Sequence, residues 1–222
     1  MRRPSAKVVS LLILAATVLQ LVVASAASNL PQFADKGFGA RLVFYPILML
    51  LVPAVWWLTA RRRPDRWERP DPPWAGFALV MAPFLVDVSG NTLNLYDAVV
   101  WWDDANHFVN WFLICLGLGL VLGVWSVRPA WAGGLAVVGG GALLALLWEI
   151  GEWWTFIRHG TELDTAYEDT LGDMTLGTCG ACVAFLVLRV YTKRRTLAAT
   201  PPLPATAATA AAPVASQASQ RD

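Results

Sequence analysis

Charged residues are scarce in this chain of 222 residues: Asp, Glu, Lys and Arg together make up only 15% of it. Hydrophobic residues make up 56%, and the mean hydropathy is +0.50. Soluble globular domains have about 25% charged and about 45–50% apolar residues. The shortage of charge therefore argues against a soluble enzyme, and the abundance of apolar residues excludes a disordered chain.

Cysteine is also rare, with three residues in the chain. So small and odd a number excludes a secreted scaffold held together by disulfides. Cys179 and Cys182 form a CxxC pair, but no second pair completes a zinc site and no neighbouring pattern indicates a redox domain. Apolar packing is the better interpretation of this pair. No internal repeat of solenoid length is present either.

Long apolar runs are what the chain does have. A helix that crosses about 30 Å of hydrocarbon needs roughly 20 residues. We therefore predict an all-α, polytopic membrane bundle of six helices, with spans at about residues 8–26, 42–60, 74–88, 106–127, 130–156 and 171–192. Residues 1–195 would form this transmembrane domain, and the Ala/Pro/Thr-rich residues 196–222 would form a disordered cytoplasmic tail.

Two of these spans need comment. Residues 8–26 have an alternative interpretation as a cleaved signal peptide, but the run exceeds the usual apolar region of about 7–15 residues, which favours a retained helix. The third span runs into the polar stretch Val86–Asp97, which is expected to break the helix near one membrane boundary. Irregular polar backbone at that depth requires protein or a water-filled cavity around it.

The orientation follows from the basic residues. With the N-terminus in the cytoplasm, twelve basic residues fall on the cytoplasmic side, and only Lys36, Arg41 and Arg158 fall outside. This asymmetry obeys the positive-inside rule, so both termini are predicted to be cytoplasmic. The basic, proline-rich loop 61–73 is suited to anionic lipid headgroups.

Small residues and tryptophans indicate how the spans pack and where they end. Small residues four positions apart let membrane helices approach closely, and tryptophans collect at membrane interfaces. We expect close packing at Gly119, Gly123, Gly141, Ala145, Gly177 and Ala181, and interfacial anchoring by Trp101, Trp102, Trp111, Trp148, Trp153 and Trp154.

Ionisable residues gather at one depth, near the outer ends of three spans. At about 1.5 Å per residue, Glu149 lies roughly 28 Å along the fifth span. His107 falls near the start of the fourth span and Asp173 near the start of the sixth. We therefore predict a shared pocket that opens away from the cytoplasm. Its expected members are Asp103, Asp104, His107, Asn110, Trp148, Glu149, Glu152, Asp169 and Asp173, with Asp87, Asn91 and Asp97 from the polar stretch after the third span.

A simpler explanation covers part of this set. Acidic residues at helix N-termini are favoured by the helix dipole, so Asp103, Asp104 and Asp169 have an alternative role as caps. That explanation fails for Glu149 and Glu152, because they lie near the C-terminus of their span, where negative charge is unfavourable. A metal ion, a proton, His107 or a cationic substrate must stabilise them.

The order of these motifs resembles a known family. Y-D-x5-D-D-A-N-H at one helix start, W-E-I-G-E-W-W at the next helix end and then D-T-L-G-D-M resemble VanZ-like membrane proteins and, more closely, the YjdF-type family of bacterial inner-membrane proteins. The similarity covers about Val80–Tyr191. It implies a compact helical bundle in the bacterial cytoplasmic (inner) membrane, with polar residues facing the outer leaflet and a role on lipids or lipid-linked envelope precursors. Its functional elements correspond to Asp103 or Asp104 with His107, to Glu149 with Glu152, and to Asp169 with Asp173.

Three functions are compatible with the pattern. The first is a hydrolase or transferase acting on lipid or lipid-linked phosphate headgroups, with His107 as base or nucleophile oriented by Asp103 or Asp104. Glu149, Glu152 and Asp173 would hold a divalent cation such as Mg²⁺ or Mn²⁺, which is needed because only Arg158 offers a nearby cation. The second is a non-catalytic binder of cationic or lipid-linked ligands, and the third is a cation-coupled transporter. The expected partners are membrane lipid and a lipid-linked substrate, not nucleic acid, and the oligomeric state does not follow from the sequence.

Overall fold

The computed structural model of the chain describes residues 5–34, 36–61, 71–155, 157–159 and 163–199. In these residues the regular structure is entirely helical, as the apolar runs predict. The helices are α1 (Ala6–Ala26), α2 (Phe38–Arg61), α3 (Trp74–Thr92), α4 (Leu95–Ala98), α5 (Trp102–Val121), α6 (Ala130–Gly134), α7 (Gly140–Thr155) and α8 (Ala166–Ala199).

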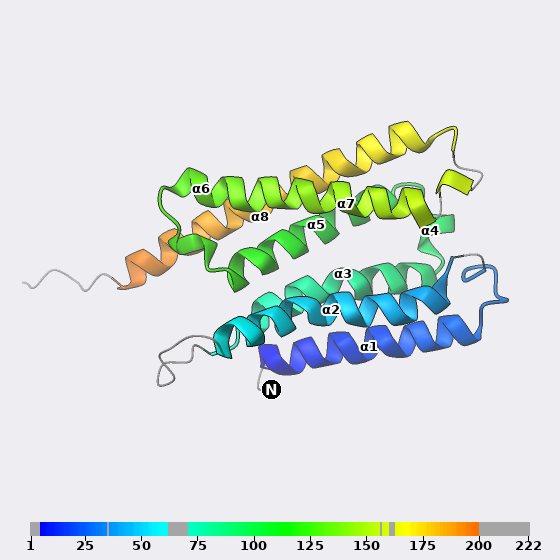
Figure 1. Ribbon diagram of the computed structural model, residues 1–222, viewed down its shortest axis with the longest axis horizontal. Helices are drawn as coiled ribbons and strands as arrows, with labels where there is room; N and C mark the ends of the chain where they lie inside the picture. The colour runs from blue at the N-terminus through cyan, green and yellow to red at the C-terminus, as the bar shows by residue number, and fades with distance from the viewer. Residues whose placement is uncertain (1–4, 35, 62–70, 156, 160–162, 200–222) are drawn as a thin grey trace, which may run out of the picture.

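Within the described residues, six stretches of helix are long and apolar enough to cross a membrane. Five are single helices, and the remaining one is α6 and α7 joined through a π-helical turn at Leu135–Gly139. The long helices run alongside one another, with α4 and the start of α8 at the same end of the bundle (Figure 1). The predicted polytopic helical bundle is therefore confirmed.

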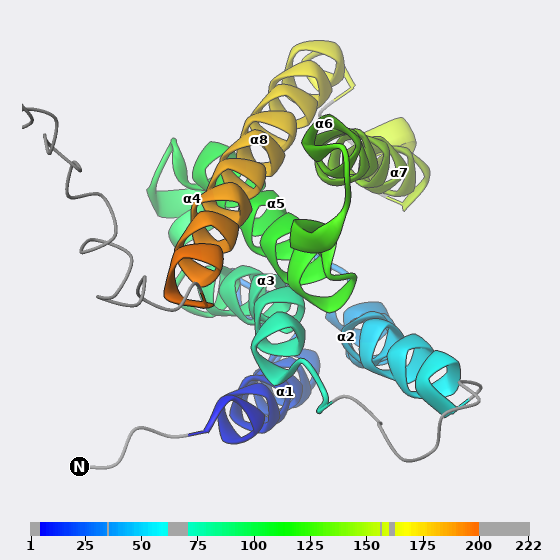
Figure 2. The same cartoon turned by 90° about the vertical axis from the view of Figure 1, so that its left-hand side faces the viewer.

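The bundle consists of two groups of helices that meet at its centre. Viewed along the helices, α1 and α2 lie beside α3 in one group, and α7 and α8 lie beside α5 in the other (Figure 2). The most extensive contacts join α5 to α8 and α3 to α5. α5 is therefore the central element, and it is the helix that carries His107.

Glycines let the central helices touch backbone to backbone. A Cβ atom on Gly117 of α5 would lie 2.8 Å from the Gly76 carbonyl oxygen of α3, and one on Gly180 of α8 would collide with the Phe108 carbonyl oxygen of α5. The predicted small residues Gly119, Gly141 and Gly177 are likewise covered by neighbouring side chains. Close packing is therefore the role of these glycines, as expected in a membrane, where apolar burial does not drive helices together.

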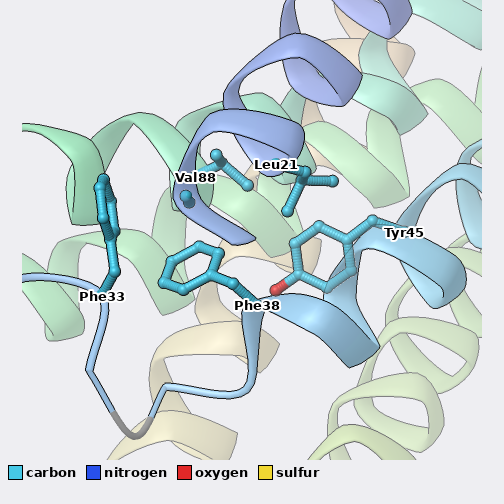
Figure 3. Close-up of a cluster of buried hydrophobic side chains, with 6 residues drawn as sticks. Leu21, Phe33, Phe38, Tyr45 and Val88 are labelled. Carbon is cyan, nitrogen blue, oxygen red and sulfur yellow. The ribbon is translucent and has the colours of Figure 1, made fainter. Parts of the chain in front are cut away.

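A cluster of apolar side chains holds α1, α2 and α3 together near one end of the bundle. Leu21, Phe33, Phe38, Tyr45 and Val88 are all buried in it (Figure 3). The rings of Phe33 and Phe38 meet edge to face, with 5.2 Å between their centroids. The Tyr45 ring packs in the same cluster, so that its position relative to α3 is fixed.

The third span ends later than expected, because the first part of the polar stretch Val86–Asp97 stays helical. α3 continues without interruption to Thr92, and only then does the chain turn, with Asn94 in the left-handed conformation, into α4. The polar side chains remain in the helix because they find partners there: the Asn91 amide donates to the Asp87 carbonyl, and the Thr92 hydroxyl donates to the Val88 carbonyl. The Ser89 hydroxyl donates a hydrogen bond to Gln20 Oε1 of α1.

Several other boundaries and placements differ from the predictions. α5 begins at Trp102, earlier than expected, so Asp103 and Asp104 lie in its first turn. Trp111, expected at the interface, is only 7% exposed and covers Gly177 of α8. α8 continues to Ala199, and residues 200–222, most of the predicted tail, lie outside the described residues.

The two ends of the bundle differ in charge as the basic residues predict. Among the described residues, Lys7, Arg128 and Lys193 lie at the end where α1 begins. The opposite end, where α5 and α8 begin, carries Asp103 and Asp169. The fold therefore separates the charges to opposite ends, and a cytoplasmic location of the basic end remains the prediction from the sequence.

Candidate functional site

His107 lies at the centre of the predicted polar layer. It is in the second turn of α5 and is only 9% exposed. Glu149 of α7 and Asp173 of α8 are buried beside it, at 4% and 3% exposure. An ionisable group inside a membrane bundle is costly, and such groups are usually paired or functional.

Carboxylates from three helices surround the imidazole ring. His107 Nε2 lies 3.6 Å from Asp173 Oδ2 and 3.8 Å from Asp103 Oδ1, and His107 Nδ1 lies 3.8 Å from Glu149 Oε1. Donor–acceptor distances in hydrogen bonds are about 2.7–3.2 Å, so these contacts are too long for direct hydrogen bonds. The three carboxylates lie close around the ring without bonding to it.

These separations suit two ligands of one metal ion. Ligand atoms about 2.0–2.2 Å from a tetrahedral ion lie roughly 3.3–3.6 Å from one another. Two groups of side chains have ligand atoms that all fall within 4.8 Å of one another: Asp103, His107 and Asp173 form one group, and His107, Glu149 and Glu152 form the other. Imidazole and carboxylate donors together suit Zn²⁺ or Mn²⁺.

Two buried polar atoms give independent support for a ligand at this position. His107 Nδ1 and Glu149 Oε1 are both shielded from solvent, and neither has a hydrogen-bond partner. Leaving such an atom unsatisfied costs about 1–3 kcal/mol. The residues therefore fit a bound cation, or a proton shared across the 3.8 Å between them.

The remaining acidic residues of the predicted pocket lie at its rim. Asp104 is exposed and within electrostatic range of His107. Asp169 is exposed in the first turn of α8 and within electrostatic range of Glu149 and Asp173. Both positions are compatible with the capping role that was the simpler explanation.

A second polar network surrounds Asp87 of α3. The Asp87 carboxylate accepts hydrogen bonds from the Arg41 guanidinium at 2.9 Å, the Tyr45 hydroxyl at 2.7 Å and the Tyr96 hydroxyl at 2.8 Å. These donors come from α2 and α4, so the network ties both elements to α3. Three donors, one of them charged, stabilise this carboxylate inside the bundle.

The network continues toward His107 through two asparagines. The Asn106 amide donates to the Tyr96 hydroxyl at 2.6 Å, and the Asn110 amide donates to Asn106 Oδ1 at 3.4 Å. Burial, followed by the charge of Asp87, raises the pKa of Tyr96 above its ordinary value, so its hydroxyl remains a donor. Asn106 precedes His107 directly, and the two networks therefore share one turn of α5.

Arg41 corrects the expectation that only Arg158 offers a nearby cation. It stands far from the acidic motifs in the sequence, but α2 brings it to Asp87 and into electrostatic range of Glu152. The rings of Phe38 and Tyr45 flank its guanidinium. Arg158, in contrast, stacks on Trp154 at 4.1 Å. In the sequence, the one indication of this role is that Arg41 is a basic residue on the predicted outer side, at the start of a span.

The other predicted pocket residues have separate surroundings. Asp97 pairs with Lys36 at 3.1 Å and is half exposed, so it belongs to the surface of α4. Asn91 is buried and bonded within α3. Trp148 is partly exposed on α7, one residue before Glu149. Sequence reasoning missed Arg41 and Tyr45, which belong to no motif, and gave no role to Tyr96 and Asn106, although both stand in the Y-D-x5-D-D-A-N-H motif.

Comparison with known proteins identifies the family of this chain but gives no activity for it. No curated protein and no solved structure matches the chain. The family described as "Predicted membrane protein (DUF2238)" matches residues 8–194, which include both polar networks and all of the six candidate spans except the first two residues of the first span. The YjdF-type resemblance is consistent with this match, whereas the likeness to VanZ-like proteins finds no support in it. The chain therefore belongs to the DUF2238 family of membrane proteins.

Proposed function

We propose that the chain is a divalent-cation-dependent hydrolase or transferase that acts on lipid or lipid-linked phosphate headgroups at the outer face of the bacterial inner membrane. The observation that carries this proposal is the convergence of Asp103, Glu149 and Asp173, from three helices, on the buried ring of His107. Structural acids that merely cap helices have no reason to meet around one imidazole.

The reaction would proceed by displacement at phosphorus. A bound cation would neutralise the phosphate oxygens and favour deprotonation of the attacking water. The water oxygen forms a bond to phosphorus while the bond from phosphorus to the leaving oxygen breaks. An ionised carboxylate at the rim, such as that of Asp104, would accept a proton from the water, and the carboxylic acid so formed would return it to the leaving oxygen. In a transferase, the hydroxyl of a second lipid would take the place of water.

The position of the cluster supports a lipid-linked substrate. His107 and Asp173 lie in the first two turns of their helices, at the end of the bundle opposite Lys7, Arg128 and Lys193. A headgroup in the outer leaflet reaches this depth without leaving the membrane. The half-exposed side chain of Asp103 provides a route to water from the same end.

Non-catalytic binding of a cationic ligand is the second candidate. It is favoured by the excess of carboxylates over cations around His107, since Arg41 is already paired with Asp87. A binder would retain the cluster and release no product. A transporter is less well supported, because the described acidic residues of the spans lie toward one end and leave no relay to the other.

The test compares turnover in purified protein reconstituted into lipid vesicles. Labelled phospholipids and polyprenyl diphosphates are incubated with wild type and with His107→Ala, in the presence of Mn²⁺ or of a chelator. We expect product that depends on the metal and disappears in the variant. The matched control is Asp97→Asn, which removes an outer carboxylate that pairs with Lys36 and not with His107. Tight binding of a ligand without any product would favour the second candidate.

A further inference from the structure

The two ring nitrogens of His107 face different surroundings. Nε2 faces Asp103 and Asp173, and Nδ1 faces Glu149, with Glu152 completing the second group of ligand atoms. The two groups share only the imidazole. They are therefore alternative cation sites on opposite sides of one ring.

The Nδ1 side is closed. Both His107 Nδ1 and Glu149 Oε1 are shielded from solvent, and Glu149 as a whole is 4% exposed. A histidine that binds a metal through one nitrogen almost always donates the N–H of its other nitrogen to a carboxylate or a carbonyl. Glu149 is the carboxylate placed for that role, and a shortening of the 3.8 Å separation would complete the hydrogen bond.

The Nε2 side is open. The Asp103 side chain is 51% exposed, so this side of the ring reaches solvent at Asp103, whereas Asp173 on the same side is buried. Asp173 and Asp103 come from different helices, and with Nε2 they supply three ligand atoms within 4.8 Å. Three protein ligands with an open position are the arrangement of catalytic metal sites.

We infer that the cation binds on the Nε2 side, to His107, Asp103 and Asp173, and that Glu149 is a positioning residue that holds the imidazole from the Nδ1 side. This inference rests on the proposed cation site and refines it. It reassigns Glu149 and Glu152, which the sequence indicated as ligands.

The experiment measures binding of Co²⁺ alone to the detergent-solubilised full chain, by visible absorption and by metal analysis. We expect one ion per chain in wild type and a loss of affinity of at least about 100-fold in Asp173→Asn. Glu149→Gln retains a carbonyl acceptor for Nδ1–H, so we expect an unchanged stoichiometry and a loss of about 10–100-fold. Glu152→Gln serves as a second variant on the closed side, and we expect it to lose less affinity for Co²⁺ than Glu149→Gln does.

The outcomes separate this inference from the proposed function. Loss of the ion in Glu149→Gln and Glu152→Gln, with retention in Asp173→Asn, would place the cation on the Nδ1 side and overturn the inference. Absence of Co²⁺ binding in folded wild type would overturn both. The expected binding pattern without turnover of any phosphate substrate would support the inference and overturn the enzymatic proposal.

Discussion

His107 Nε2 lies 3.6 Å from Asp173 Oδ2, although one residue belongs to α5 and the other to α8. This contact exists because α5 and α8 are the most extensively packed pair of helices in the described part of the chain. The site therefore depends on an interface built from small residues. Its properties can be tested by changing the interface, the ion pairs around it or the conditions.

The α5–α8 interface offers the first test. Gly180→Ala adds a methyl group against the Phe108 backbone, which cannot move aside as a side chain does. We expect a destabilisation of about 1–3 kcal/mol, the usual range for overpacking. Thermal unfolding in detergent measures it. Gly172→Ala on the same helix meets nothing within 4 Å and is expected to be neutral or slightly stabilising.

The Arg41–Asp87 pair offers a second test. Arg41→Gln leaves the largely buried Asp87 carboxylate without its charged donor, which should cost about 1.5–3 kcal/mol of stability. Asp87→Asn alone should cost a similar amount, while the double variant should cost less than the sum, because neither partner remains charged. Chemical unfolding of wild type, the two single variants and the double variant provides a double-mutant cycle. Strictly additive losses would show that the pair makes no net contribution.

The Lys36–Asp97 pair is the control for that cycle. Its side chains are 25% and 51% exposed, and exposed ion pairs contribute about 0–1 kcal/mol. Lys36→Gln should therefore change the unfolding midpoint little. If Lys36→Gln lowered the free energy of unfolding as much as Arg41→Gln does, ion pairs at this end of the bundle would stabilise the fold irrespective of their burial.

Tyr96 predicts a dependence of stability on alkaline pH. Burial and Asp87 raise its pKa in the folded protein, so above about pH 10 the unfolded chain releases the proton that the folded chain retains. The stabilisation is complete below pH 10 and falls as pH rises further. Tyr96→Phe should be less stable than wild type at neutral pH and should lose less stability between pH 9 and roughly pH 11. Parallel pH profiles for the two proteins would contradict this account.

The orientation of the bundle can be tested by labelling. In a chain whose native cysteines are replaced, a cysteine at Asp97 should react with a membrane-impermeant maleimide added to intact cells. A cysteine at Arg128 should react only after the membrane is permeabilised, because the basic end is predicted to face the cytoplasm. The reverse pattern would place the His107 cluster on the cytoplasmic side and remove the outer leaflet as its source of substrate.

The sequence by itself determined the helical class, the six spans and the end of the bundle at which acids collect. Apolar runs of membrane length allow only helices, because every backbone group must be satisfied within its own segment. Depth along each helix is a simple function of residue number, so Glu149 and Asp173 could be placed at one level. The continuation of α3 to Thr92 could not be predicted, because it depends on hydrogen bonds from Asn91 and Thr92.

Only the tertiary structure decided which side chains at that level meet. Rotation of each helix about its axis is set by packing, and here glycines such as Gly117 and Gly180 fix it by direct backbone contact. Helix packing turns Asp173 and Glu149 toward His107 and Arg41 toward Asp87, and the turn into α4 places Asp97 beside Lys36. Residue number gives the height of a charge in the bundle, whereas the direction it faces depends on the neighbouring helices.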